Sequence, residues 1–362
     1  MRKSSLLIAL AVAALSACCT EEKDYTSFVD PYIGSGGHGH VFVGASVPFG
    51  MVQLGPQQIK DEWDWCSGYH YSDTLVIGFS HTHLTGTGIG DLGDVLMMPY
   101  DPAKVKYDTS WAKRKNADAT HIYALLDHSK EEVRPGFYSL EMPDYGVAAR
   151  LTATDRTGLH EYTFTGDRSA ILLDLCTGIG WDGVTDWDFS WLSPSRIEGY
   201  RRSSGWAKDH TIWFAAEFSS PVMEYENIPI TGDEYAVAII FDTSSQKKIA
   251  VKVGLSPVSC ANAWENLNAE QTGWDFEAVA QAAKDRWNAE LGRIEIEEMD
   301  ARQRKLFYTS LYHTMIAPSL FSDRNGEYRG ADAKVHTSDE NQYTVLSLWD
   351  TYRAEYPLMT II

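Results

Sequence analysis

Short apolar runs separated by polar turns dominate the chain from Tyr25 to about residue 260. The runs are rich in β-branched and aromatic residues and are bounded by Gly, Asp and Asn, as strands usually are; examples are residues 151–155, 171–175, 212–216, 236–240 and 249–253. No helical pattern alternates with them, which argues against a parallel sheet with crossover helices. The pattern predicts a mainly β fold, a large antiparallel β-sandwich, with residues 156–158 (RTG) as one hairpin turn.

The spacing of apolar residues changes after Cys260. Between residues 274 and 291, apolar side chains recur every three or four positions, which is the pattern of one helical face; they are Phe276, Ala280, Ala283, Trp287 and Leu291. A second helical stretch follows Asp300, with apolar residues four apart at Phe307, Leu311 and Met315. The sandwich is therefore expected to lead into connector helices.

A third helix is expected to open near Ser347, which has the side chain of a helix cap. The helix would continue through Tyr352 and Glu355 and would end or kink at Pro357. The chain then stops in an apolar run, residues 359–362, without a cap or a polar tail. This ending indicates a fragment or a truncated reading frame.

The first residues have the features of an export signal. Arg2 and Lys3 precede an apolar run over residues 6–17, which is too short to span a bilayer but suits a signal-peptide core. The run ends in Leu-Ser-Ala-Cys18, which is similar to a lipobox with Cys18 as the acylated residue; an ordinary signal peptide with a chance Cys is the alternative. Residues 18–24 form a polar tether. We expect an exported bacterial lipoprotein, periplasmic or at the cell surface, anchored in the outer membrane.

Composition narrows the function classes. The formal net charge of −19 argues against nucleic acid and anionic membrane surfaces as partners, because both require clustered Lys and Arg. The 12 Trp and 19 Tyr suit either a large β-rich core or the stacking of sugar rings on aromatic faces. Beyond Cys18 the cysteines are Cys19, Cys66, Cys176 and Cys260. They are few and widely spaced, so they imply no disulfide framework, although one bridge is possible.

Residues 34–99 contain most of the candidate chemistry. A Gly-rich loop, residues 34–40 (GSGGHGH), lacks the Lys-Ser/Thr and helix pattern of a nucleotide loop, so its glycines are expected in tight turns or close backbone contacts. His81 and His83 would point to one face of a strand. They are candidate zinc ligands together with further side chains from His38, His40, Asp91 or Asp94. The alternative is that these histidines bond to buried backbone groups.

Eight segments, taken together and in order, resemble glycoside hydrolase family 92. They are residues 28–34 (FVDPYIG), 47–56 (VPFGMVQLGP), 67–71 (SGYHY), 78–88 (GFSHTHLTGTG), 93–99 (GDVLMMP), 133–138 (VRPGFY), 152–158 (TATDRTG) and 347–353 (SLWDTYR). The resemblance implies a β-sandwich packed against an (α/α)6 barrel, with the active site between them. It also implies a calcium-dependent exo-α-mannosidase that inverts the anomeric centre.

The resemblance implies roles for a few residues. Trp349 and Asp350 match the family's Trp-Asp pair, which contacts the terminal mannose, and Trp65, Cys66 and Gly68 occupy the sandwich loop expected to reach the site. His81 and His83, which match a family motif, are expected to be scaffolding at the domain interface.

The resemblance places the catalytic Glu and Asp, and most Ca²⁺ ligands, beyond residue 362, so no acid or base is nominated here. Inversion requires those two carboxyl groups to lie about 6.5–9.5 Å apart. The partners would be mannose-containing glycans, either N-glycans or mannans. The sequence does not fix the linkage, with α1,2-linked mannose as one candidate.

The expected organisation is a signal peptide (1–17), a tether (18–24), a β-sandwich (25–265), a helical connector (266–300) and the incomplete start of an (α/α)6 barrel (301–362). The leading hypothesis is therefore the amino-terminal part of an α-mannosidase, possessing only one complete face of the active site. Two alternatives remain: a non-catalytic carbohydrate-binding sandwich, motivated by Trp-rich loops, and a zinc hydrolase built on His81 and His83.

Overall fold

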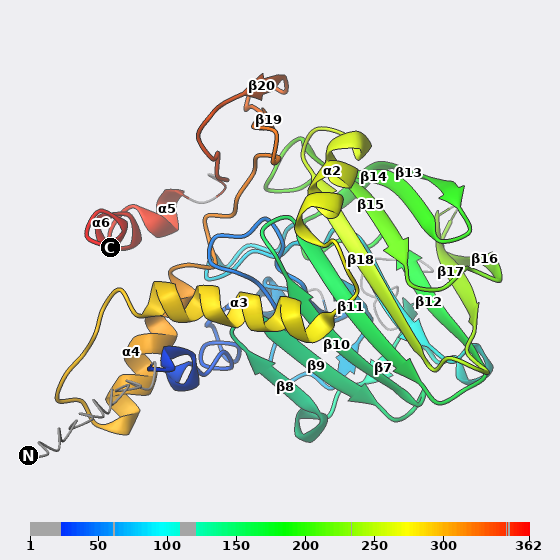
Figure 1. The fold of residues 1–362 in the computed structure, drawn as a ribbon, viewed down its shortest axis with the longest axis horizontal. Helices are drawn as coiled ribbons and strands as arrows, with labels where there is room; N and C mark the ends of the chain where they lie inside the picture. Colours follow the sequence, from blue (N-terminus) through cyan, green and yellow to red (C-terminus); the bar gives the residue numbers. More distant parts are fainter. Residues whose placement is uncertain (1–22, 61, 109–120, 233, 345, 347) are drawn as a thin grey trace, which may run out of the picture.

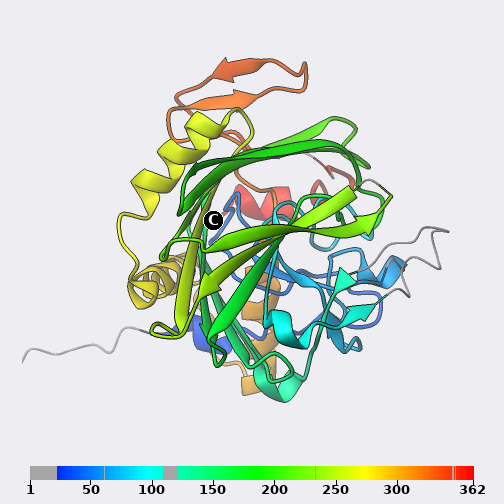
Figure 2. The ribbon, with the colours of Figure 1, turned by 90° about the vertical axis from the view of Figure 1, so that its right-hand side faces the viewer.

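Two antiparallel sheets packed face to face make up most of the chain (Figures 1 and 2). The computed structural model describes residues 23–60, 62–108, 121–232, 234–344, 346 and 348–362. The expected signal peptide, with Cys18 and Cys19, and the expected helix cap Ser347 lie outside the described residues. Among the described residues, no helix is both long enough and apolar enough to cross a membrane.

The strands of both sheets pair only in antiparallel fashion where the structure describes them. The six-stranded sheet has the order β1 (Gly55–Gln57), β3 (Gly78–Ser80), β4 (Leu96–Tyr100), β12 (Arg168–Asp174), β17 (Glu234–Asp242), β16 (Glu224–Thr231). The eight-stranded sheet has the order β13 (Gly183–Ser193), β14 (Arg196–Ser204), β15 (His210–Phe218), β18 (Lys248–Ser256), β11 (Thr157–Phe164), β10 (Val147–Ala153), β9 (Phe137–Met142), β8 (Glu131–Arg134). The predicted antiparallel sandwich is confirmed.

Smaller elements connect and edge the sheets. Three ribbons pair β2 (Leu75–Val76) with β7 (Ala124–Leu125), β5 (Tyr107–Asp108) with β6 (His121–Ile122), and β19 (Glu327–Arg329) with β20 (Val335–Thr337). Single 3-10 turns are η1 (Tyr25–Phe28), η2 (Trp63–Trp65), η3 (Pro102–Lys104) and η4 (His128–Lys130). The helices are α2 (Cys260–Glu270), α3 (Phe276–Leu291), α4 (Ala301–His313), α5 (Leu348–Thr351) and α6 (Glu355–Met359).

The main core lies between the two sheets, where apolar side chains of both inner faces meet. β18 is buried on both faces, because α2 covers its outer side and packs Ala263 and Leu267 near Gly254. β13 instead alternates exposed and half-buried residues, as expected for an edge strand with one solvent face. The hairpin between β10 and β11 turns at residues 154–156, and Gly158 already pairs with Ala153 in the sheet. The turn therefore lies slightly earlier than the predicted residues 156–158.

The two predicted helices after residue 260 are confirmed as α3 and α4. In α3 all five residues of the predicted apolar face are buried, and Asp275 caps the helix through Ala278 N, 3.1 Å away. Asp300 begins α4 with a capping box that includes Gln303. Trp287 of α3 donates from Nε1 to the Ser46 carbonyl oxygen at 2.7 Å, which joins the helical layer to the sandwich segment. α2 spans the expected boundary at residue 265.

The third predicted helix forms differently. It is broken into α5 and α6, and Pro357 lies in the first turn of α6 instead of ending a helix. A continuous helix would bring the Pro357 ring against the carbonyl of Arg353, and the chain avoids this clash by ending the first helix at Thr351. In the first turn of a new helix the missing N–H of proline costs nothing.

Candidate functional site

A cavity of about 790 Å³ is lined by the sandwich, by the end of α4 and by the segments that follow it. Its size lies within the range of about 300–1,000 Å³ that is usual for small-molecule sites. The sandwich side contributes loop and strand residues that include Gln53, His83, Thr85, Trp206 and His210, and the other side contributes residues that include His313, Ser319, Tyr343, Asp350 and Glu355. In Figure 1 the α5 and α6 segment lies apart from the sheets and on the same side of the molecule as α4.

Trp206 connects the two sides of this cavity. Its indole Nε1 donates to the carbonyl oxygen of Leu346 at 2.7 Å, and its side chain remains partly exposed. Asp91 holds the same loop, because one of its carboxylate oxygens accepts from Ala207 N at 2.7 Å. An aromatic face held in a cavity wall is suited to stack on the apolar face of a sugar. Sequence reasoning missed Trp206, since it lies in a loop with no recognisable motif.

The structure separates the predicted pair Trp349 and Asp350. Asp350, on α5, lines the cavity, whereas Trp349 is 77% exposed and is absent from the cavity wall. The Trp349 ring lies 6.3 Å from that of Tyr352, measured between centroids. Of the two, Asp350 is therefore positioned to meet a ligand that occupies the cavity.

Trp65, Cys66 and Gly68 do not line this cavity, and the structure does not bring them together with Asp350. Trp65 is buried, stacks on His70 and donates to Asp73 at 2.8 Å. Burial raises the pKa of the Cys66 thiol to about 11. Cys66, Cys176 and Cys260 are all free, so none of the described cysteines forms a bridge.

Gly68 supports the cavity wall from behind. It has a φ of +83°, and a Cβ there would meet His83 at 2.9 Å. His83 lines the cavity, so the glycine allows close packing behind a cavity residue.

His81 and His83 are buried scaffold residues. Their Nδ1 atoms donate to the carbonyl oxygens of Val95 and Gln53, at 2.7 and 2.8 Å. Burial lowers the pKa of each imidazole to about 4, so both are neutral near pH 7. His81 Nε2 lies 3.0 Å from His160 Nε2, deep inside the sandwich. The alternative interpretation, in which these histidines satisfy buried backbone groups, agrees with the structure.

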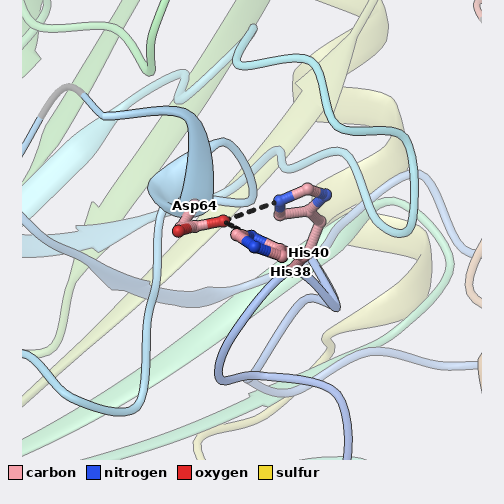
Figure 3. Close-up of side chains that lie close together, drawn as sticks. All are labelled: His38, His40 and Asp64. Atoms are coloured by element: carbon pink, nitrogen blue, oxygen red, sulfur yellow. Dashed lines mark hydrogen bonds and ion pairs between the residues drawn. The ribbon is translucent and has the colours of Figure 1, made fainter.

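A zinc site around His81 and His83, one of the alternatives that the sequence leaves open, does not form among the described residues. Among the described residues, one group of His, Cys, Asp or Glu side chains has ligand atoms close enough to share an ion, and it consists of His38, His40 and Asp64 (Figure 3). His81 and His83 follow the end of β3, and their Nδ1 atoms bond to the carbonyl oxygens of Val95 and Gln53, so their shared face does not bring them together with His38 and His40.

A buried charge network lies beneath the sandwich side of the cavity. Arg201 on β14 is fully buried and donates from Nη1 to Asp94 Oδ1 at 2.7 Å and from Nη2 to Asp182. Asp94 also pairs with His210 Nε2 at 2.7 Å and accepts from Thr82 Oγ1 at 2.6 Å. Burial alone would raise the pKa of Asp94, but the charges of His210 and Arg201 outweigh it and hold that pKa well below its usual range.

This network fixes one residue of the cavity wall. Burial by itself would lower the pKa of His210, but the Asp94 carboxylate raises it above the ordinary value. His210 therefore lines the cavity with a ring whose orientation is set by Asp94. Sequence reasoning listed Asp94 only as a possible metal ligand and missed both Arg201 and His210.

Glu355 is a second cavity carboxyl group, five residues after Asp350. Burial, followed by the nearby Asp350 charge, raises the pKa of Glu355 to about 7. A carboxyl group with this pKa exchanges its proton near neutral pH, which is a property that general acids require. No sequence motif marks Glu355 as a proton-exchanging group, because its pKa shift arises from burial and from the Asp350 charge.

Comparisons with known proteins agree with this architecture. The family model described as the glycosyl hydrolase family 92 N-terminal domain matches residues 28–256, and that of the family 92 catalytic domain matches residues 262–362. The two matches cover the sandwich and the helical part that follows it.

Two solved structures and one curated relative are similar over most of the chain. A family GH92 α-mannosidase from Bacteroides thetaiotaomicron, solved with mannoimidazole, is 30% identical in sequence to this chain. The two structures superpose with a TM-score of 0.84, and the match covers 93% of this chain and 46% of the mannosidase. A family GH92 inverting mannosidase from B. thetaiotaomicron VPI-5482 is 26% identical in sequence, with a TM-score of 0.77. This match covers 93% of the present chain and 46% of that mannosidase.

The curated relative is described as an uncharacterized secreted glycosidase of Arthroderma benhamiae. It is 26% identical over 355 residues, which cover 88% of this chain and 45% of the relative. The chain thus spans less than half the length of each of these three proteins.

Proposed function

The chain belongs to glycoside hydrolase family 92, and from that premise we propose that it is the amino-terminal part of an exo-acting, inverting α-mannosidase. The observation that carries the proposal is the shared cavity, in which Asp350 from the helical part faces sandwich residues such as Trp206 and His210. Two similar solved proteins are named as mannosidases, one of them as inverting. Terminal mannose on N-glycans or mannans, α1,2-linked mannose included, is the proposed substrate.

The cavity chemistry suits a neutral sugar. Asp350 offers a carboxylate that accepts hydrogen bonds from two hydroxyl groups, and Trp206 offers an aromatic face for the apolar side of a pyranose. The strongly acidic chain has no excess of cations with which to bind an anionic ligand. These features support a glycan ligand over a phosphorylated one.

The described residues receive neither catalytic role in this proposal. An inverting enzyme needs an acid and a base on opposite faces of the sugar. We propose that both lie beyond Ile362, since the similar mannosidases are about twice as long as this chain. The part described here then supplies binding and orientation of the terminal sugar.

Calcium dependence of the complete enzyme is part of the proposal, but the described residues do not fit a calcium site. Ca²⁺ takes about six to eight oxygen ligands. The one described group close enough to share an ion contains two imidazoles and a single carboxylate. We therefore derive no step through calcium from these residues.

We also propose export and acylation at Cys18, a residue outside the described part of the chain. The lipobox-like Leu-Ser-Ala-Cys18 and the description of the A. benhamiae relative as secreted support this. Mass spectrometry of the mature amino terminus checks it; an unmodified residue at that position would contradict acylation.

The test of the proposed function is mannose release by the complete gene product. We expect release from at least one of the α1,2-, α1,3-, α1,4- and α1,6-linked mannobioses, with β-mannose as the first anomer seen by NMR. Chelation should abolish release, and CaCl2 should restore it. The 362-residue chain, measured in parallel, is expected to release none.

Other outcomes have definite meanings. Glycan binding by the complete product without release would favour the carbohydrate-binding alternative. α-Mannose as the first product would reject inversion, and activity that survives chelation would reject the calcium requirement.

A further inference from the structure

Three potential metal ligands from two separate segments meet at the edge of the sandwich. His38 and His40 belong to the Gly-rich loop, and Asp64 belongs to η2 (Figure 3). His38 Nδ1 lies 2.6 Å and His40 Nε2 lies 3.3 Å from the same Asp64 oxygen. All three ligand atoms lie within 4.8 Å of one another.

The loop is shaped to present both imidazoles to one point. Gly39 separates the two histidines, and a Cβ on it would lie 2.0 Å from the Gly34 carbonyl oxygen, so no other residue fits there. His40 adopts a φ of +56°, a left-handed conformation that is uncommon for residues other than glycine. This backbone conformation places the His40 ring beside Asp64.

One side of the cluster is covered and the other is open. The Trp63 ring packs against both imidazoles, with centroids 4.3 Å from His40 and 5.1 Å from His38. The His40 side chain is 6% exposed, whereas that of His38 is 73% exposed. An ion bound here would be shielded from behind by an aromatic ring and would keep a coordination position toward solvent.

The donor set selects the class of metal. Two imidazoles and one carboxylate suit a borderline-soft divalent ion, and Ca²⁺ disfavours nitrogen ligands. Zinc bonds to His nitrogen at about 2.0–2.1 Å in tetrahedral geometry, which separates its ligand atoms by about 3.3–3.5 Å. The His40–Asp64 distance of 3.3 Å already matches this spacing, whereas the His38–Asp64 distance of 2.6 Å would have to widen by less than about 1 Å.

We propose that His38, His40 and Asp64 form a three-ligand Zn²⁺ site with water in the fourth position. The site connects to the cavity, because the His40 carbonyl oxygen accepts from Gly86 N at 2.7 Å and Trp63 Nε1 donates to Gly88 O at 2.9 Å. Gly86 lines that cavity. Zinc would brace the Gly-rich loop against η2 and thereby support the 85–88 loop at the cavity wall. This proposal does not depend on mannosidase activity.

The test is titration of the metal-free 362-residue protein with ZnCl2 by calorimetry and with Co²⁺ by visible absorption. We expect one Zn²⁺ equivalent and a tetrahedral Co²⁺ spectrum. His38→Ala and Asp64→Asn should each weaken binding by at least about tenfold and remove that spectrum. Wild-type-like binding by either variant would overturn the proposal, as would displacement of Co²⁺ by millimolar Ca²⁺.

The matched control is His336→Ala. His336 also pairs with a carboxylate, Asp332, at 2.9 Å on an exposed surface, but this pair lies outside the three-ligand group. Zn²⁺ binding by this variant should equal that of the wild type. The exposed His38 is the preferred site of substitution because its loss leaves the fold intact, which far-UV circular dichroism without metal verifies.

Discussion

Replacing Asp350 with alanine is expected to lower kcat/KM of the complete gene product for a mannobiose by about 100- to 20,000-fold. The carboxylate lines the cavity, and the proposed sugar would donate two hydroxyl hydrogen bonds to it. Each hydrogen bond to a charged group contributes about 1.5–3 kcal/mol, and about 1.4 kcal/mol corresponds to tenfold in rate. Initial-rate measurements of mannose release check this value.

A matched control separates this loss from a general effect of removing an acidic side chain. Asp339→Asn changes an exposed carboxylate in the same part of the chain, outside the cavity wall, and should leave kcat/KM unchanged. Both variants should melt within a few degrees of the wild type, because α5 contains no buried residue. If Asp350→Ala keeps at least about a third of wild-type kcat/KM, Asp350 has no part in sugar binding.

Replacing Arg201 with methionine is expected to lower the free energy of unfolding by about 3–5 kcal/mol. Arg201 is fully buried. Its removal leaves the buried carboxylates of Asp94 and Asp182 without the guanidinium that pairs with both of them. The desolvation cost of those carboxylates then goes uncompensated. Urea unfolding at pH 7 measures the loss.

The pH dependence of this variant should also change. Because the folded-state pKa of Asp94 lies below its unfolded value, its ion pairs contribute stability above about pH 4, and this contribution is lost as the pH falls toward the folded pKa. Without Arg201, whose charge helps to hold the pKa of Asp94 down, Asp94 takes up a proton more readily in the folded state. Acidification from pH 7 to pH 5 should therefore reduce the stability gap between the variant and the wild type.

The control for Arg201 is an arginine in an exposed pair. Arg168 bonds to Glu224 with both side chains about half exposed. Arg168→Met should cost about 1 kcal/mol or less, because water already solvates both partners. Equal losses for the two variants would mean that burial of the Arg201 network has no special effect on stability.

Local pattern was enough to predict the secondary structure where each segment encodes its own burial. The helix α3 follows from apolar residues every three or four positions, and the second helix begins after Asp300 as expected. The expectation that Pro357 would end or kink the helix was wrong, because proline also fits the first turn of a helix.

Histidine function could not be predicted from spacing alone. Both His-x-His pairs look alike in the sequence, yet His81 and His83 donate to two separate backbone carbonyl oxygens while His38 and His40 converge on Asp64. The difference depends on what the fold places opposite each pair, and no local pattern contains that information.

By itself, the sequence determined the antiparallel sandwich, the capped helices that follow it and the family, because apolar periodicity and collinear motifs reside within single segments. The tertiary structure alone decided which side chains share a site. Asp64 meets His38 across 26 residues, Arg201 meets Asp94 across 107, and Trp206 meets Leu346 across 140. Such pairs form only when sheet packing brings distant segments within hydrogen-bonding distance, so their chemistry depends on the fold and not on any one stretch of chain.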